Sequence, residues 1–259
     1  MGEQKRPRLY VHPASLQRIK YPYLMFNMAE ERRLGKERWF RENWFEHAIL
    51  DAGVETFFFV RRLKDYPKEF LEMYRYKAII ATRHYGKNKI WVTIPDYPDD
   101  YQQELTWENG KTNVEKTFDN IEAFKNIDEV EWIYPLQANY LNRKSFREAC
   151  KRLKDEVNPK IVGIGTVCKT RDIPFITYCI KEARLILGEN TWLHAFGPTL
   201  SALPKIWFYL DSFDSSAQFH INGHMVKCVE ERIEAFQIWT KRVEAIMGKT
   251  LLSDFLRLT

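Results

Sequence analysis

The sequence predicts an α/β protein that folds as one (β/α)8 TIM barrel spanning residues 1–259. Short apolar runs alternate with segments of helical periodicity, which is typical of repeated βα units. Several of the runs are apolar throughout, as expected for a parallel sheet covered by helices. About eight such runs occur, and no linker rich in Pro, Gly or Ser divides the chain. These observations favour a single closed barrel over an open doubly wound sheet.

The predicted elements follow one another along the chain. The predicted strands are Tyr23–Phe26, a short run ending at Leu50, Ala78–Thr82, Lys89–Ile94, Trp132–Leu136, Ile161–Val167, Trp192–Phe196 and Ile206–Leu210. The predicted helices are Glu37–Ala48, Lys68–Tyr76, Val114–Asn126, Arg143–Val157, Ile173–Leu187 and a last helix from about Val226 to Met247. No loop of the GxGxxG or GxxxxGK[ST] type is present, which argues against the nucleotide-binding α/β folds.

The composition excludes several classes of protein. Hydrophobic residues make up 45% of the chain and charged residues 29%, which excludes disorder and collagen-like repeats. No apolar run approaches the roughly 18 residues of a membrane helix, and the charged start MGEQKRPR does not resemble a signal peptide. We therefore expect a cytoplasmic protein without a membrane partner. Its four cysteines show no CxxC spacing, and its net charge of +5 permits contact with nucleic acid.

Polar residues follow several of the predicted strands, where a barrel places its active site. They are Asp51, Asp96, Gln137, Asp211 and Asp214. A lone aspartate is more often a helix cap or a turn residue. Several carboxylates at one apolar-walled mouth shift one another's pKa values, which suits acid-base and nucleophilic chemistry. The set as a whole therefore predicts an active site.

Six segments carry a family resemblance, which spans roughly Leu50 to Ala217. In chain order they are LDAGVETFF, VTIPDYP, PLQA, IVGIGTVCK, LHAFG and LDSFDSSA. Their order and content resemble the motifs of the tRNA-guanine transglycosylase superfamily, with LDSFDSSA the most specific. The pair IVGIGTVCK and LHAFG is more similar to the DNA-modifying branch, the 7-deazaguanine DNA transglycosylases, than to the tRNA enzymes.

The resemblance implies roles for the strand-end residues. It makes Asp214 the nucleophile that attacks the anomeric carbon of a guanosine nucleotide, a role that suits a carboxylate. It makes Asp51 the general acid/base for the leaving or entering base. Asp96 would accept hydrogen bonds from the amide and amino edge of the base, and Gln137 would bind the carbonyl of the base. Asp211 would support the site near the nucleophile.

Further residues would shape the base pocket. Gly163 and Gly165 would let bare backbone approach the base, and Phe196 would stack on its ring. Lys169 and Arg171 directly follow the GIG strand, so we expect them to contact the phosphates of a flipped nucleotide. The implied activity is a pentosyltransferase that exchanges guanine in nucleic acid for a free 7-deazaguanine, without a cofactor. DNA is the preferred polymer, and tRNA is the alternative.

The sequence also departs from the family pattern. Ala52-Gly53-Val54-Glu55 replaces a small-Gly-Gly-aromatic segment, so that wall of the pocket must be built differently. A cation at Lys169 argues against an aminomethyl base and favours a neutral one such as 7-cyano-7-deazaguanine. The CxCxxC zinc motif of the tRNA branch is absent.

A metal site is not expected at the start of the last helix. His220, His224 and Cys228 are spaced i, i+4, i+8, but one helix face cannot easily surround a tetrahedral ion. The two histidines fit equally well as a polar first turn of that helix.

Two other functions remain open. The chain could be a catalytically silent barrel that serves as an accessory subunit, although such a subunit has no chemical need for both Asp51 and Asp214. It could also be an unrelated barrel glycosidase with paired carboxylates. That function would not account for Asp96, Gln137 and the two glycines. Nothing in the sequence predicts an oligomeric state.

Overall fold

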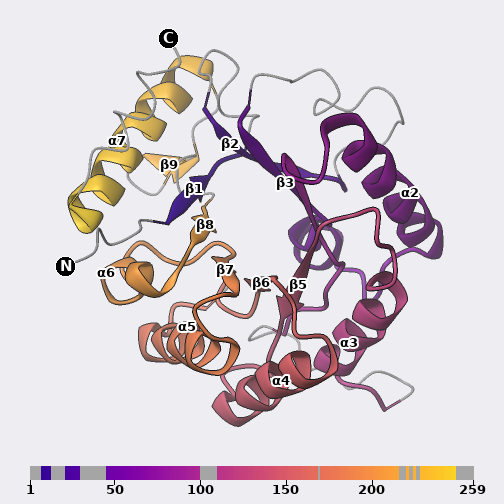
Figure 1. Ribbon diagram of the computed structural model, residues 1–259. Helices are drawn as coiled ribbons and strands as arrows, with labels where there is room; N and C mark the ends of the chain where they lie inside the picture. The colour runs from indigo at the N-terminus through magenta and orange to yellow at the C-terminus, as the bar shows by residue number, and fades with distance from the viewer. Residues whose placement is uncertain are drawn as a thin grey trace.

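Eight parallel strands form the barrel, as the sequence predicts (Figure 1). The computed structural model describes residues 7–12, 21–29, 45–99, 110–168, 170–215, 220–221, 224–225 and 228–248. The strands are β1 (Arg8–Tyr10), β2 (Tyr23–Asn27), β3 (His47–Asp51), β4 (Ile90–Thr93), β5 (Trp132–Leu136), β6 (Ile161–Ile164), β7 (Trp192–Ala195) and β8 (Ser212–Asp214). Neighbouring strands end in register, with Tyr10 beside Asp214 and Asn27 beside Asp51. Polar strand ends therefore gather at one end of the barrel.

The barrel closes between β1 and β2. Val11 and Leu24 form a parallel bridge next to the two strands. The Val11 N–H donates to the Tyr23 carbonyl at 3.1 Å, and the Met25 N–H donates to the Val11 carbonyl at 2.9 Å. Backbone pairing thus continues around the ring, which leaves little exposed sheet edge.

Helices surround the barrel (Figure 1). They are the π-helix η2 (Glu55–Val60), α2 (Lys68–Tyr85), α3 (Asn113–Phe124), α4 (Arg143–Glu156), α5 (Ile173–Leu187), α6 (Leu203–Ile206), the 3-10 helix η3 (Trp207–Tyr209) and α7 (Val229–Met247). Local signals set their ends. Thr112 and Glu115 form a capping box at the start of α3. The Asp172 side chain caps α5 by accepting from the Phe175 N–H at 2.7 Å, and Gly188 follows the last turn.

The predicted strand Ala78–Thr82 is wrong, because this segment belongs to α2. Tyr74, Ala78 and Ala81 are all buried at helical spacing on the face that packs against the barrel. A short apolar run has the same appearance in a buried strand and in a buried helix turn. The helix predicted over Lys68–Tyr76 is correspondingly longer than expected.

The predicted strand Ile206–Leu210 is also wrong. Ile206 ends α6, and η3 follows it directly. Pro204 lies in the first turn of α6, a position that proline favours. The strand at this point is β8, which begins after Asp211. Strands β1 and β8 have three residues each and include polar ones, so neither gives a recognisable apolar run.

Two helix boundaries need further correction. Residues 37–44 of the predicted helix Glu37–Ala48 lie outside the described residues, and Ala48 itself belongs to β3. The last helix begins at Val229, later than predicted. His220 and His224 precede it on the antiparallel strands β9 (His220–Ile221) and β10 (His224–Met225), rather than on a helix.

Large side chains fill the interior of the barrel from its amino-terminal end up to the floor of a cavity, where Tyr10 and Phe196 lie. A buried cluster there combines side chains from four strands and the segment after β7, namely Tyr10, Ile49, Ile133, Ile161 and Phe196. Arg8 lies over the rings of Tyr23 and Trp192, at 5.2 Å and 4.9 Å from their centroids. The other end is left for a cavity. None of the helices in the described part of the chain is long and apolar enough for a membrane crossing.

Candidate active site

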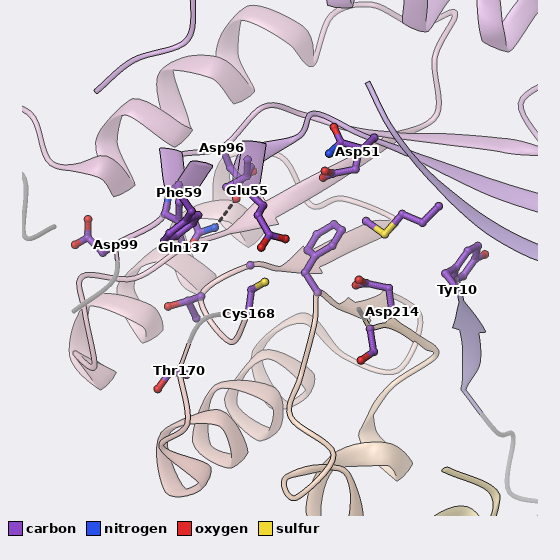
Figure 2. Close-up of a pocket in the computed structure, with 18 of the residues that line it drawn as sticks. Tyr10, Asp51, Glu55, Phe59, Asp96, Asp99, Gln137, Cys168, Thr170 and Asp214 are labelled. Carbon is purple, nitrogen blue, oxygen red and sulfur yellow. Dashed lines mark hydrogen bonds between the residues drawn. The ribbon is translucent and has the colours of Figure 1, made fainter. Parts of the chain in front are cut away.

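A cavity of about 390 Å³ opens at the carboxyl ends of the strands (Figure 2). Each of the eight strands, or the residues shortly after it, contributes at least one lining side chain or backbone position, and one from each is named here. These are Tyr10, Asn27, Asp51, Asp96, Gln137, Gly165, Phe196 and Asp214. Six of the predicted site residues are therefore brought together, namely Asp51, Asp96, Gln137, Gly165, Phe196 and Asp214.

Asp51 ends β3 and turns its carboxylate into the cavity (Figure 2). Its Oδ2 accepts the Gly53 N–H at 2.8 Å. Gly53 has a φ of +82°, and a Cβ there would lie 2.4 Å from both the Ala29 Cβ and the Asn27 Oδ1, so this turn requires glycine. Burial, and next the carboxylate of Asp96, raise the pKa of Asp51 to about 7, although the Gly53 hydrogen bond opposes the shift. Near neutral pH, Asp51 can therefore both hold and release a proton.

Asp96 and Gln137 form a buried pair beside Asp51. Their exposed fractions are 4% and 2%, and the Gln137 Nε2 donates to the Asp96 Oδ2 (Figure 2). Burial raises the pKa of Asp96 to about 6, while the hydrogen bond from Gln137 lowers it. The Tyr66 hydroxyl donates to the Asp96 carbonyl at 3.0 Å and so fixes the backbone at this position.

The pair has an unfilled hydrogen-bonding capacity. Among the described residues, the Gln137 Oε1 is buried without a hydrogen-bond partner, which is costly unless a ligand supplies a donor. The atom that Gln137 offers is thus an acceptor, so binding a base carbonyl would require its amide group to turn over. The Asp96 carboxylate and the Gln137 Oε1 are both acceptors, which suits a ligand that carries several N–H groups.

The two predicted glycines act differently. A Cβ on Gly165 would lie 2.2 Å from the Gln137 Nε2 and 3.0 Å from the Asp96 Oδ2, so Gly165 makes room for the pair. Gly163 does not line the cavity. A Cβ there would lie 2.3 Å from the Phe196 Cε2, so Gly163 contributes by letting this ring lie against β6. Phe196 itself is 9% exposed and lines the cavity.

Asp214 ends β8, and its side chain is 18% exposed. Its Oδ1 accepts the Gly197 N–H at 2.9 Å and lies 3.3 Å from the His194 Nε2. The Oδ2 has no hydrogen-bond partner in the described part of the chain. One oxygen of this carboxylate is therefore held by the protein, and the other is available for a reaction in the cavity.

Asp211 lies at the opposite end of the same strand and does not line the cavity. The Arg184 Nη2 donates to the Asp211 Oδ2 at 2.7 Å, and the Leu193 N–H donates to the same oxygen at 2.9 Å. Arg184 also donates to three backbone carbonyls, those of Tyr209, Gly188 and Thr191. The expectation that Asp211 follows a strand and supports the site near Asp214 is wrong, because the segment before Asp211 is helical.

Of the two predicted phosphate contacts, only Arg171 is described by the structure, and it is not part of the cavity wall. Lys169 lies outside the described residues, and Arg171 is exposed and does not line the cavity, although its neighbour Thr170 does. Arg232 of α7 and His12 line the cavity instead. Both residues lie outside the segment that carries the resemblance, so no motif pointed to them.

Sequence reasoning missed other lining residues, among them Tyr10, Met25, Asn27, Glu55 and Cys168. Asn27 directly follows the predicted strand Tyr23–Phe26, so the rule that selected Asp51 could have found it. Tyr10 ends a strand too short to be recognised.

No group of three or more His, Cys, Asp or Glu side chains is placed to hold a metal ion within the described residues. Comparison with known proteins adds no relative: no family model matches the chain, and no curated protein matches it.

Proposed function

We propose that this barrel is a guanine transglycosylase, a pentosyltransferase that replaces guanine in nucleic acid with a free 7-deazaguanine. The observation that carries the proposal is the combination of carboxylates in one cavity. Asp214 has one unengaged oxygen, Asp51 has a pKa of about 7, and Asp96 is buried against an amide with a free acceptor. These are the nucleophile, the acid/base and the base-binding group that the reaction needs.

The reaction proceeds in two displacements at the same carbon. In the first, the Asp214 Oδ2 attacks C1′ of the nucleotide, the bond to guanine breaks, and protonated Asp51 gives its proton to the leaving base. In the second, the Asp51 carboxylate takes the proton from the ring nitrogen of the entering 7-deazaguanine, and this nitrogen attacks C1′ and displaces Asp214. One glycosidic bond breaks and one forms, so no cofactor is required.

Base recognition follows from the unfilled acceptors. The edge of guanine presents a ring N–H and an amino group, which match the acceptor atoms of Asp96 and Gln137. Phe196 offers a ring face for stacking, and Gly165 keeps the Asp96–Gln137 pair unobstructed. A volume of about 390 Å³ suits a base with its sugar. A guanine in a duplex must leave the base stack to reach this depth.

DNA is the proposed polymer, and 7-cyano-7-deazaguanine is a fitting entering base. Both choices rest on sequence features: the IVGIGTVCK and LHAFG segments for DNA, and the cation Lys169 for a base without an aminomethyl group. Transfer to tRNA is the alternative within the same mechanism.

The other two functions receive less support. A silent accessory barrel gains nothing from Asp51, because burying a carboxylate without a cation destabilises the fold. A glycosidase with paired carboxylates would not need the buried Asp96–Gln137 pair. Its product would be a free sugar end rather than an exchanged base.

The test is an exchange assay with purified full-length protein. Labelled guanine is incubated with the protein and either duplex DNA or tRNA, and the label in each polymer is counted. We expect label in DNA, and replacement of that label by unlabelled 7-cyano-7-deazaguanine in a second incubation. Label in tRNA alone would move the proposal to the alternative polymer. Incorporation into neither would contradict it, and base release without incorporation would favour the glycosidase.

A further inference from the structure

A buried histidine next to Asp214 has no role in the mechanism described so far. His194 in β7 is 0% exposed, and its ring lies between those of Tyr10 and Phe196, with centroid distances of 5.7 Å and 4.6 Å. Both ring nitrogens have polar neighbours. The Nδ1 lies 2.9 Å from the Ser212 Oγ, and the Nε2 lies 3.3 Å from the Asp214 Oδ1.

The position of the imidazole proton follows from the hydrogen bonds that Ser212 and Asp214 make with the His194 ring. The Trp192 Nε1 lies 2.8 Å from the Ser212 Oγ, and an indole N–H can only donate. Ser212 therefore accepts from Trp192, and its own hydrogen is available to donate to the His194 Nδ1. A carboxylate oxygen can only accept, so the contact between the His194 Nε2 and the Asp214 Oδ1 calls for a proton on Nε2, which leaves Nδ1 to accept from Ser212.

Two N–H donors are directed at the same oxygen of the Asp214 carboxylate. The Asp214 Oδ1 receives two N–H donors, the Gly197 amide at 2.9 Å and the His194 Nε2. Gly197 has a φ of +53°, a left-handed conformation that favours glycine and that aims its amide at this oxygen. Both donors engage Oδ1, so Oδ2 is the oxygen left for the covalent bond.

We infer that His194 is a positioning residue whose Nε2–H, fixed by Trp192 and Ser212, prepares Asp214 to act both as nucleophile and as leaving group. This inference rests on the proposed function. When the aspartyl-nucleotide bond breaks, negative charge returns to the Asp214 carboxylate, and donors already aimed at Oδ1 stabilise that charge. When the bond forms, the same donors mainly fix the orientation of the carboxylate. Loss of His194 should therefore slow the breakdown of the adduct more than its formation.

Three variants distinguish the hydrogen bonds of His194 from the contribution of its ring to packing. His194→Phe keeps a ring of similar size but has neither donor nor acceptor. His194→Gln retains both functions, because its carbonyl can accept from Ser212 while its amide donates to Asp214. His47→Phe is the matched control, since His47 is also a buried barrel histidine, 4% exposed, but its Nδ1 lies 2.8 Å from the Tyr10 hydroxyl, and it is hydrogen-bonded to no carboxylate among the described residues.

The experiment measures formation and breakdown of the covalent protein–oligonucleotide adduct separately, by rapid quenching and denaturing gels. We expect His194→Phe to slow breakdown by about 10- to 100-fold, the usual effect of losing a hydrogen bond to a charged group, and to slow formation less. His194→Gln should restore most of the rate, and His47→Phe should leave both rates unchanged. Wild-type breakdown rates in a folded His194→Phe variant would contradict the inference alone, whereas the absence of any adduct in the wild-type protein would contradict the proposed function.

A second measurement reads the tautomer directly in the wild-type protein. The tautomer of each histidine can be read from nitrogen-15 chemical shifts of the full-length protein, with the His194 signal assigned as the one that disappears in His194→Gln or, if that variant is insoluble, by residue-selective labelling. We expect a neutral ring with its proton on Nε2. A proton on Nδ1, or on both nitrogens, would overturn the inference.

Discussion

An aspartate lies at each end of strand β8, and the two carboxylates differ in whether a cationic side chain is paired with them. Asp211, before the strand, is paired with Arg184 and receives a backbone N–H. Asp214, at the end of the strand, receives the Gly197 N–H and lies beside His194, with no Lys or Arg paired to it in the described structure. A carboxylate with a counter-charge stabilises the fold, whereas one without a counter-charge remains reactive.

The two ends of the barrel show the same difference in the balance of charge. Asp51 and Asp96 lie at the mouth with Asp214, and burial with little cationic compensation raises the pKa of both carboxyl groups. At the amino-terminal end, Arg8 and Arg184 supply positive charge close to the aromatic side chains and to Asp211. The buried carboxylates at this end therefore lower the stability of the protein, a cost that the proposed chemistry would explain.

The largest expected effect is on base exchange, and it distinguishes the two aspartates at the ends of β8. Asp214→Asn should abolish the covalent adduct and lower base exchange by at least about 10³-fold, because the amide has a similar shape but is a poor nucleophile. Asp211→Asn should retain exchange per folded molecule. It should instead lower the free energy of unfolding by about 3 kcal/mol, because it removes the nearer counter-charge of Arg184 and leaves only the exposed Glu189, at 3.9 Å. Denaturant unfolding and the exchange assay measure the two effects, and the reverse pattern would contradict the contrast.

The next effect concerns proton transfer. Asp51→Asn should lower exchange by about 10²- to 10⁴-fold, the usual range for loss of a general acid/base. The remaining rate should lose the pH dependence centred near 7 that the proposed mechanism assigns to this residue. A pH profile unchanged by the substitution would assign the proton transfer to another group, with Asp96 the next candidate.

A smaller effect is expected on affinity for the free base. Asp96→Ala should weaken binding of 7-cyano-7-deazaguanine by about 1–3 kcal/mol, roughly 5- to 150-fold in Kd, because buried N–H donors of the base would be left unpaired. Calorimetry with the wild-type and variant proteins measures this change. Equal affinity would show that Asp96 is a structural turn residue only.

The smallest effect is a gain in stability at high pH. The folded-state pKa of Asp51, about 7, lies above its ordinary value, so the folded protein binds this proton more tightly than the unfolded chain does. Stability due to Asp51 is therefore lost as pH rises from about 4 to 7. Asp51→Asn should raise Tm by a few degrees, about 5 °C, at pH 8 and have little effect at pH 4. A Tm difference that is largest at pH 4 would contradict the assigned shift.

Much of the architecture could be predicted because local signals agree with the fold. The bounds of α5 are those of the predicted helix Ile173–Leu187, since Asp172 and Gly188 mark its ends in the sequence. Strand β5 likewise matches the predicted run Trp132–Leu136. Strands β1 and β8 could not be found in this way, because a three-residue strand is defined by its neighbours across the sheet rather than by its own composition.

Residues of the candidate site could be predicted where the sequence indicates the end of a strand. Asp51, Asp96, Gln137 and Asp214 each follow or end a strand and meet in one cavity. The role of Asp211 was misjudged because no pattern in LDSFDSSA reveals that Arg184, on a helix far earlier in the chain, neutralises the first aspartate.

The most direct test of the assignment of Asp214 is to locate the covalent bond. The protein is reacted with a guanine-containing duplex oligonucleotide, denatured without heating and digested, and the modified peptide is sequenced by mass spectrometry. We predict that the nucleotide is attached to Asp214, within the peptide that also contains Asp211. Attachment to Asp211 or to another residue, or exchange of labelled guanine without any adduct, would contradict the assignment of Asp214 as the nucleophile.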